Sequence, residues 1–244
     1  MSPIRTVFAG AKGRMGAALL PGLARTDDIE IVAQVDVGDD LVATARAARA
    51  EVVIDFTVPS VAVANARRIL DAGCHGVIGT TGFTESDLVD LDARARTAKR
   101  ALLIAPNFAL GVLLMVRFAA EASRWFQRSE IVELHHDGKL DAPSGTALRT
   151  AQAMGAAGSG GGPTVGDAAA RGAVHAGVHI HSVRIPGFTA TQEVMFGQPG
   201  EVLTIRHDAF SRECYLPGVV MGVRAVRGKT GLLRGLESIL PPPS

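Results

Sequence analysis

The first 36 residues carry the pattern that most constrains the fold. An apolar run at 4–9 meets a glycine-spaced turn at 10–16, which is followed by an amphipathic stretch at 17–24. A second apolar run, at 29–35, ends at Asp36. This order of strand, glycine turn, helix, strand and acid is that of a βαβ dinucleotide-binding unit. We therefore expect the chain to begin with a nucleotide-binding fold.

Each part of this unit suits a nucleotide. Glycines let the backbone turn tightly beside a pyrophosphate, and a helix N-terminus offers free N–H groups and the positive end of its dipole. Asp36 lies about 20 residues beyond the glycines, where a carboxylate can accept hydrogen bonds from a ribose diol. Lys12 and Arg14 add charge near the phosphates. The spacing is G-x-x-G-x-x-G rather than G-x-G-x-x-G, so a tight turn that binds no ligand is the alternative.

The rest of the first half repeats strands and helices. Apolar runs at 52–57, 76–78 and 101–105 alternate with helical stretches at 61–72 and 85–99, the latter capped by Thr84. The alternation predicts a doubly wound parallel sheet of the Rossmann type.

Ligands bind beyond the carboxyl ends of the strands in such a sheet. We expect the ends at 10–16, 55–57, 79–81 and 105–108 to face a cofactor. The alternative is that Thr80, Thr81 and Asn107 only satisfy backbone groups of their loops.

The pattern changes after Asn107. A long apolar helix is expected at 108–126 and a shorter helix at 145–154, with a glycine-rich loop at 155–163. The strands expected in this half lie at 130–136, 178–185, 191–196 and 201–207, the last two joined by a hairpin turn at 197–200. A final helix is expected at 217–226, and the prolines at 241–243 belong to a frayed tail.

Two domains follow from this change of pattern. Residues 1–107 form a dinucleotide-binding domain, on which we expect 217–244 to pack back. Residues 108–216 form an α+β domain with a mixed or antiparallel sheet, which we expect to bind substrate and to form oligomers.

Composition excludes several classes of protein. The net charge is +1 and aromatic residues make up 5% of the chain, which argues against nucleic-acid binding. The chain lacks an apolar run near the ~20 residues of a membrane span, and its N-terminus lacks a signal-peptide pattern. Two unpaired cysteines suit the cytoplasm. His175, His179, His181 and His207 lack the spacing of metal ligands, so we expect no metal.

Residues 130–147 concentrate ionisable and donor groups. In a regular strand His135 and His136 face opposite ways, so they are not expected to act as one pair unless the strand has already ended. Lys139 lies on the following loop, and Ser144 is the expected N-cap of a helix that begins with Gly145. A helix N-terminus beside a lysine suits a carboxylate, and a histidine suits proton transfer. The alternative is a loop of solvated charges that caps a helix.

This stretch resembles the signature of the 4-hydroxy-tetrahydrodipicolinate reductase (dihydrodipicolinate reductase) family. Segments 10–16, 54–57, 79–83 and 105–108 match it in the family's order, so the resemblance covers essentially the full chain. It implies NADH- or NADPH-dependent reduction of a small cyclic hydroxy-dicarboxylate, with loss of water, in lysine and diaminopimelate biosynthesis. It also implies a cytoplasmic homotetramer assembled through the sheet of the second domain.

The resemblance also implies roles for single residues. His135 and Lys139 take the proton-transferring positions. The positions implied to bind substrate are His136, Ser144, Gly145 and Thr146. The positions implied to bind NADH or NADPH are Gly10, Ala11, Lys12, Gly13, Arg14, Met15, Asp36, Gly79, Thr80, Thr81, Ala105, Pro106, Asn107 and Phe108.

The chain departs from the family's pattern at two places, and its choice between NADH and NADPH stays open. Gly138 stands where the family often has a histidine, and the strand at 189–193 lacks another, so substrate affinity is expected to differ. Asp36 favours NADH because a carboxylate repels a 2′-phosphate, whereas Lys12 and Arg14 offset that repulsion and admit NADPH.

Two other functions remain as alternatives. A different dehydrogenase, acting on an amino acid or a sugar, would share the first half without needing the Ser-Gly-Thr turn. A nucleotide-sensing regulator would bind NAD(H) without turnover.

Overall fold

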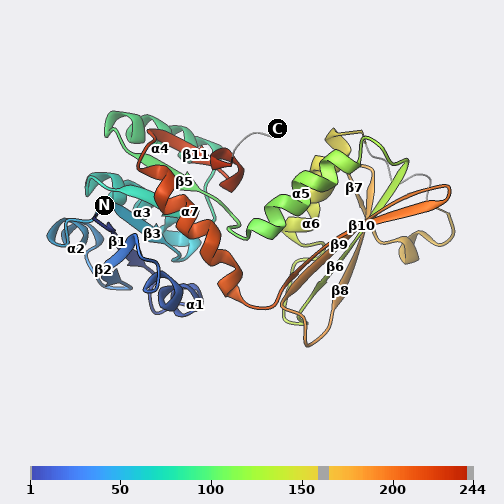
Figure 1. Ribbon diagram of the computed structural model, residues 1–244, viewed down its shortest axis with the longest axis horizontal. Coiled ribbons are helices and arrows are strands. Elements are labelled where there is room, and N and C mark those ends of the chain that lie inside the picture. The colour runs from blue at the N-terminus through green and yellow to red at the C-terminus, as the bar shows by residue number, and fades with distance from the viewer. Residues whose placement is uncertain (1, 159–164, 241–244) are drawn as a thin grey trace. The chain divides into compact units, whose positions relative to one another are not determined.

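The computed structural model describes residues 2–158 and 165–240. The chain forms two compact units, Met1–Leu110 with Arg212–Ser244 and Gly111–Ser211, called here the first and the second unit (Figure 1). The predicted domain limits, 1–107 with 217–244 and 108–216, stay predictions. Within the described residues, no helix is long and apolar enough to cross a membrane.

The first unit is built on a parallel sheet, as predicted, and this sheet has six strands. Its strands are β1 (Ile4–Ala9), β2 (Ile29–Val35), β3 (Val52–Asp55), β4 (His75–Ile78), β5 (Ala101–Ile104) and β11 (Gly231–Arg234). They lie in the order β11-β5-β4-β3-β1-β2. The order reverses direction between β1 and β3, which is the switch point where open α/β sheets bind their ligands.

Helices cover both faces of this sheet (Figure 1). They are α1 (Arg14–Leu23), α2 (Leu41–Ala47), α3 (Pro59–Asp71), α4 (Glu85–Thr97) and α7 (Leu216–Val226). Helix α7 approaches Val77 and Leu103 through Gly222, whereas Ile69 of α3 shares a core cluster with Ile78 and Leu102. Successive strand residues point to opposite faces, so α3 and α7 lie on opposite sides of the sheet.

Local sequence explains the start of α4 but not every element. Thr84 caps α4 as predicted, and Asp87 completes a capping box with it. Helix α2 and strand β11 were not predicted, because stretches of seven and four residues are too short to show a period. Pairing with β5 stabilises β11, and sequence alone does not reveal that contact.

The second unit, predicted to have a mixed or antiparallel sheet, has a mixed one. Its strands are β6 (Arg128–His135), β7 (Ala173–His175), β8 (Val178–Arg184), β9 (Ala190–Gln198) and β10 (Glu201–Ala209), in the order β10-β9-β6-β8-β7. Among the pairings of this second sheet, as far as the structure describes it, only β6–β8 is parallel.

Helices α5 (Leu110–Ala122) and α6 (Gly145–Ala156) share one apolar core with this sheet. Its buried members are Met115, Ala119, Ile131, Ala147, Ala151, Met154, Val178, Ile180, Val194 and Phe196. Ile131 lies at the centre of β6 on the helix-covered face, and Glu133 and His135 follow it at alternate positions on the same face.

The remaining elements are short 3₁₀ turns at Ala168–Arg171, Arg212–Tyr215 and Leu236–Ile239. The glycine-rich loop expected at 155–163 is only partly described. Helix α6 continues through Ala156, whereas 159–164 and the tail at 241–244 lie outside the described residues.

Candidate active site

The glycine turn of the first unit leaves a helix N-terminus open. Gly10 has a φ of 83°, and a Cβ there would lie 2.5 Å from the carbonyl oxygen of Phe56. A Cβ on Gly16 would lie 2.1 Å from the carbonyl oxygen of Ala11. Gly13 is the N-cap of α1 and provides no side-chain cap. The first N–H groups of α1 are therefore free to bind an anion.

Asp36 lies beside this turn. One carboxylate oxygen accepts a 2.8 Å hydrogen bond from the backbone N–H of Lys12, and the other accepts one of 2.8 Å from Val37. The Lys12 bond is the main reason that the pKa of Asp36 is lowered. The side chains of Lys12 and Arg14 are exposed, and Ala11 and Met15 are half-buried.

Asp55 ties together two strand ends at the switch point. It is fully buried, and its Oδ1 accepts hydrogen bonds of 2.7 Å from the hydroxyls of Thr57 and Thr80. The amide of Asn65 donates to Oδ2 at 2.9 Å. Thr80 therefore points into the unit while Thr81 is exposed. Gly79 is required next to them, because a Cβ there would lie 2.0 Å from the ring of Phe56.

The loop after β5 has a more structural character. Phe108 is buried and packs against Phe56, with ring centroids 5.6 Å apart. Asn107 Oδ1 accepts a 2.8 Å hydrogen bond from the backbone N–H two residues later. Ala105 is buried and Pro106 exposed. Pro106 and the partly exposed Asn107 are the accessible members of this predicted set.

In the second unit, His135 ends β6 beside a buried carboxylate. Its Nδ1 lies 2.5 Å from Oε2 of Glu133, which shares its face of the strand. The side chain of Glu133 is 0% exposed and that of His135 is 13% exposed. This bond occupies Nδ1, so Nε2 is the ring nitrogen that remains for another partner.

Three further groups hold Glu133 as an anion. Arg184 donates from Nη2 to Oε1 at 2.7 Å and from Nη1 to Oε2 at 3.1 Å, and the backbone N–H of Ser144 donates to Oε1 at 3.3 Å. Burial alone would raise the pKa of Glu133. Hydrogen bonds from His135, Arg184 and Ser182 outweigh burial and lower the pKa to about 2. An ionised carboxylate only accepts hydrogen bonds, so Nδ1 of His135 carries a proton.

Lys139 and Asp141 pair on the loop that follows β6. Lys139 Nζ donates to Asp141 Oδ1 at 2.6 Å, and the backbone N–H of Lys139 donates to the carbonyl of His136 at 3.1 Å. The Lys139 bond is the main reason that the pKa of Asp141 is lowered, and the backbone N–H of Gly145 contributes. The side chain of His136 is exposed.

The N-terminus of α6 has the predicted cap. Ser144 Oγ accepts a 3.2 Å hydrogen bond from the backbone N–H of Ala147, and Ser144 is buried. A Cβ added to Gly145 would meet open space. Thr146 is half-buried and uses its carbonyl to accept from the hydroxyl of Thr150. A carboxylate can therefore approach the backbone at Gly145.

Sequence reasoning gave no role to three residues at these two places. They are the buried Asn65 and Glu133 and the half-buried Arg184, whereas Asp55 was expected only as part of a strand end that faces the cofactor. Glu133 gave a usable signal, because a carboxylate two residues after Ile131 and two before His135 lies on the core face of its strand. Arg184 gave no such signal, because it lies 51 residues from Glu133 in the sequence and binds it only in the folded chain.

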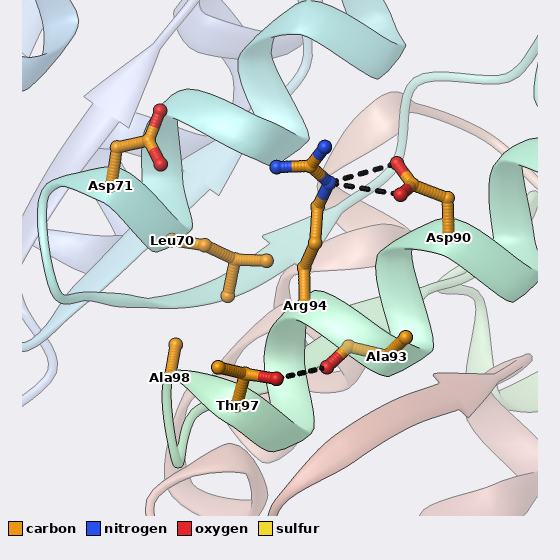
Figure 2. A pocket seen from close by; sticks show the side chains of 7 residues that line it. All are labelled: Leu70, Asp71, Asp90, Ala93, Arg94, Thr97 and Ala98. Atoms are coloured by element: carbon orange, nitrogen blue, oxygen red, sulfur yellow. Dashed lines mark hydrogen bonds and ion pairs between the residues drawn. The ribbon is translucent and has the colours of Figure 1, made fainter.

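A surface cavity of about 400 Å³ lies away from these groups, between α3 and α4 (Figure 2). It is lined by Leu70, Asp71, Asp90, Ala93, Arg94, Thr97 and Ala98. Asp90 already binds Arg94 at 2.9 Å, and the Thr97 hydroxyl donates to the carbonyl of Ala93. The cavity lies near the C-terminal ends of both helices, and these face the opposite edge of a βα sheet from the carboxyl ends of the strands. We assign it no function.

Potential metal ligands do not gather within the described part of the chain. Groups of three or more histidine, cysteine, aspartate or glutamate side chains with the required proximity are absent there. His179 and His181 instead bind the carbonyl of Arg171 and the carboxylate of Glu130.

Comparison with known proteins covers both units. A family model described as "Dihydrodipicolinate reductase, N-terminus" matches residues 4–108, and one described as "Dihydrodipicolinate reductase, C-terminus" matches 111–240. The 4-hydroxy-tetrahydrodipicolinate reductase of Moorella thermoacetica is 43% identical over 264 residues, which cover 98% of this chain and 99% of that protein. That of Mycolicibacterium vanbaalenii is 45% identical over 243 residues, covering 97% and 99%.

Solved structures agree with this result. The dipicolinate-bound dihydrodipicolinate reductase from Paenisporosarcina sp. TG-14 has a TM-score of 0.87 at 34% identity, covering 98% of this chain and 100% of that chain. An amine dehydrogenase from Mycobacterium smegmatis has a TM-score of 0.65 at 14% identity, covering 99% and 97%, and shares the fold alone. The chain belongs to the dihydrodipicolinate reductase family.

Proposed function

We propose that this protein reduces 4-hydroxy-tetrahydrodipicolinate to tetrahydrodipicolinate, with loss of water and oxidation of NADH or NADPH, in lysine and diaminopimelate biosynthesis. Membership of the family over both units carries this proposal. The reaction consumes one hydride from the cofactor and one proton from the medium.

The first unit has the groups to hold NADH or NADPH. The open N-terminus of α1 suits the pyrophosphate, and Asp36 suits the adenosine ribose. The strand ends at 79–81 and 105–108 suit the nicotinamide, which supplies the hydride when bound. Asp36 favours NADH, and the exposed Lys12 and Arg14 admit NADPH, so kcat/KM measured with each cofactor decides the preference.

The second unit has the groups to hold and protonate a dicarboxylate. The relative from Paenisporosarcina binds dipicolinate, a planar dicarboxylate of the same size class as the substrate. We assign one substrate carboxylate to the backbone of Gly145 and Thr146 at the N-terminus of α6, with Ser144 holding the turn and His136 beside it. Lys139 exchanges its bond to Asp141 for a bond to substrate. His135 and Lys139 then handle the proton.

The experiment is a cofactor-oxidation assay with freshly generated 4-hydroxy-tetrahydrodipicolinate. We expect turnover with at least one of the two cofactors and inhibition by dipicolinate. Binding of NADH without turnover would favour the nucleotide-sensing regulator, and turnover only of an amino acid or sugar would favour another dehydrogenase.

Lys139→Ala tests the assigned proton chemistry. We expect kcat to fall by about 10²–10⁴-fold, the usual range for a lost acid–base group. The matched control is Lys229→Ala, which removes an exposed lysine of the first unit and should leave kcat unchanged. An unchanged kcat in Lys139→Ala would remove Lys139 from the mechanism.

We further propose a cytoplasmic homotetramer that forms through the sheet of the second unit. Strand β10 lies at the edge of that sheet, and its Val202 and Leu203 are 72% and 39% exposed. Exposed apolar side chains on an edge strand favour association. Light scattering should give four times the 25.4 kDa mass of the chain, and a monomer would contradict this assembly.

A further inference from the structure

Strands β6 and β8 join two similar charge clusters. Glu130 binds Nε2 of His181 at 2.8 Å and also binds Arg171. Glu133 binds Nδ1 of His135 at 2.5 Å and also binds Arg184. Each cluster holds one carboxylate, one imidazole and one guanidinium, on opposite faces of the same strand.

The two clusters differ in how deeply they are buried. The side chains of Glu130 and His181 are 26% and 25% exposed, whereas those of Glu133 and His135 are 0% and 13% exposed. Water competes for the hydrogen bonds of the first cluster and is excluded from Glu133. A charge-assisted bond in a dry site fixes its partner far more firmly than one at the surface.

Arg184 fixes the geometry of Glu133. Its two Nη atoms bind the two carboxylate oxygens, so the carboxylate plane cannot rotate freely. The same guanidinium donates to the carbonyls of Val183 at 2.8 Å and Asp141 at 2.7 Å. Arg184 therefore links Glu133 both to strand β8, through the carbonyl of Val183, and to the loop that carries Lys139, through the carbonyl of Asp141.

Glu133 also reaches the proposed substrate site. Its Oε1 accepts from the backbone N–H of Ser144, the N-cap of α6. One buried carboxylate thus contacts the ring of His135 and the start of the helix to which we assign the substrate carboxylate. The distance between these two places is set through Glu133.

We propose that Glu133, anchored by Arg184, is the positioning residue for His135 in the reductase reaction. It holds the ring by Nδ1–H, so Nε2 is the nitrogen that exchanges a proton with substrate, and it keeps that nitrogen in register with the N-terminus of α6. The proposal rests on the proposed function. It adds a residue that acts through His135 and does not touch the reacting atoms.

Glu133→Gln tests this role while keeping the shape of the side chain. Arg184 has only donors, so the single oxygen of the glutamine is drawn to the guanidinium. The new NH₂ group then faces His135 Nδ1, which must accept a hydrogen bond, and the ring proton moves to Nε2. We expect kcat to fall about 10²-fold, within the range for the loss of a general acid or base. The KM and the Kd of dipicolinate should change by less than about 3-fold.

A double-mutant cycle separates positioning from structural support. In a His135→Ala background, Glu133→Gln should change kcat by less than about 2-fold, because its effect passes through the imidazole. Equal losses of kcat in both backgrounds would overturn the proposal. Glu130→Gln is the matched control on the same strand, and an equal loss there would also overturn it.

Side-chain NMR of His135 tests the proposal without turnover. In the wild-type protein, nitrogen chemical shifts should report a proton on Nδ1 of His135, and a proton on Nε2 alone in the neutral ring would overturn the proposal. This measurement remains decisive if Glu133→Gln does not fold. It also remains decisive if the wild-type protein fails to reduce the proposed substrate, a result that would contradict the proposed function only.

Discussion

Each unit holds one fully buried carboxylate close to the end of a strand, and the two have different partners. Asp55 accepts only from neutral donors, the hydroxyls of Thr57 and Thr80 and the amide of Asn65 among them. Glu133 accepts from a guanidinium and an imidazole. Both residues are 0% exposed, so burial alone does not distinguish their roles.

The partners show what each carboxylate can do. Neutral hydroxyl and amide donors fix backbone segments in place, and Asp55 thereby joins the end of β3 to the loop after β4. A carboxylate that shares a hydrogen bond with an imidazole also fixes where the proton of that ring lies. We infer that Asp55 shapes the cofactor platform and that Glu133 serves proton transfer. Three substitutions or titrations test this difference.

The largest effect should come from Arg184→Met. This change leaves Glu133 buried without its cation, and breaking such a pair by removing one partner lowers the free energy of unfolding by about 3–5 kcal/mol. Chemical denaturation measures the loss. Adding Glu133→Gln should recover part of it, because the uncompensated charge disappears.

The matched control for this substitution is Arg206→Met. The side chain of Arg206 is 47% exposed and pairs with Glu193 and Asp208 on the sheet. Exposed ion pairs contribute little to stability, so the loss should be far smaller. Equal losses in the two variants, or no recovery on adding Glu133→Gln, would show that Arg184 stabilises by packing and not by charge.

A smaller effect is expected from Asp55→Asn. The new amide offers one oxygen and places a donor among the donors of Thr57, Thr80 and Asn65, which should cost about 1–3 kcal/mol of unfolding free energy. Because Thr80 loses its fixed partner, we expect the Kd for NADH to rise about 10-fold, equivalent to about 1.4 kcal/mol. The value of kcat at saturating NADH should be the same in Asp55→Asn as in the wild-type protein.

Asp90→Asn is the control for the cofactor effect. Asp90 binds Arg67 and Arg94 beside the surface cavity of Figure 2, and its loss should leave NADH binding unchanged. If Asp55→Asn instead lowered kcat and left NADH binding intact, Asp55 would resemble Glu133 and the comparison would fail.

Sequence predicted the platform better than the buried networks. The runs that became β1 and β2 were predicted with their observed limits, because apolar strands bounded by a glycine turn give a strong local signal. The cap at Ser144 follows from an equally local rule. The opposite faces expected for His135 and His136 do not apply, because β6 ends at His135. A mixed or antiparallel sheet was predicted for the second unit, and the sheet is mixed.

What sequence could not predict depends on distant contacts. Arg184 reaches Glu133 only because β8 pairs with β6, and Asn65 reaches Asp55 only because α3 packs back over β3. Phe108 of the predicted cofactor set is buried and packs on Phe56, a contact that the sequence does not reveal, and its place in the cofactor site stays a prediction. Patterns along the chain identify which residues carry chemistry, whereas tertiary pairing decides which of them hold the others.

The smallest effect is a pH dependence of stability. The pKa of Glu133 is lowered from 4.5 to about 2 in the folded protein, so the unfolded chain binds a proton first as pH falls. The stabilisation is complete well above pH 4.5 and is lost progressively between about pH 4.5 and 2. At pH 4.5 the loss should be about half a kcal/mol, since the unfolded carboxyl is then half protonated. Glu133→Gln should lack this loss, and unfolding curves of the two proteins between pH 6 and 4 measure the difference. Parallel curves would mean that Glu133 is not held as an anion, which would also remove the reason for its control of His135.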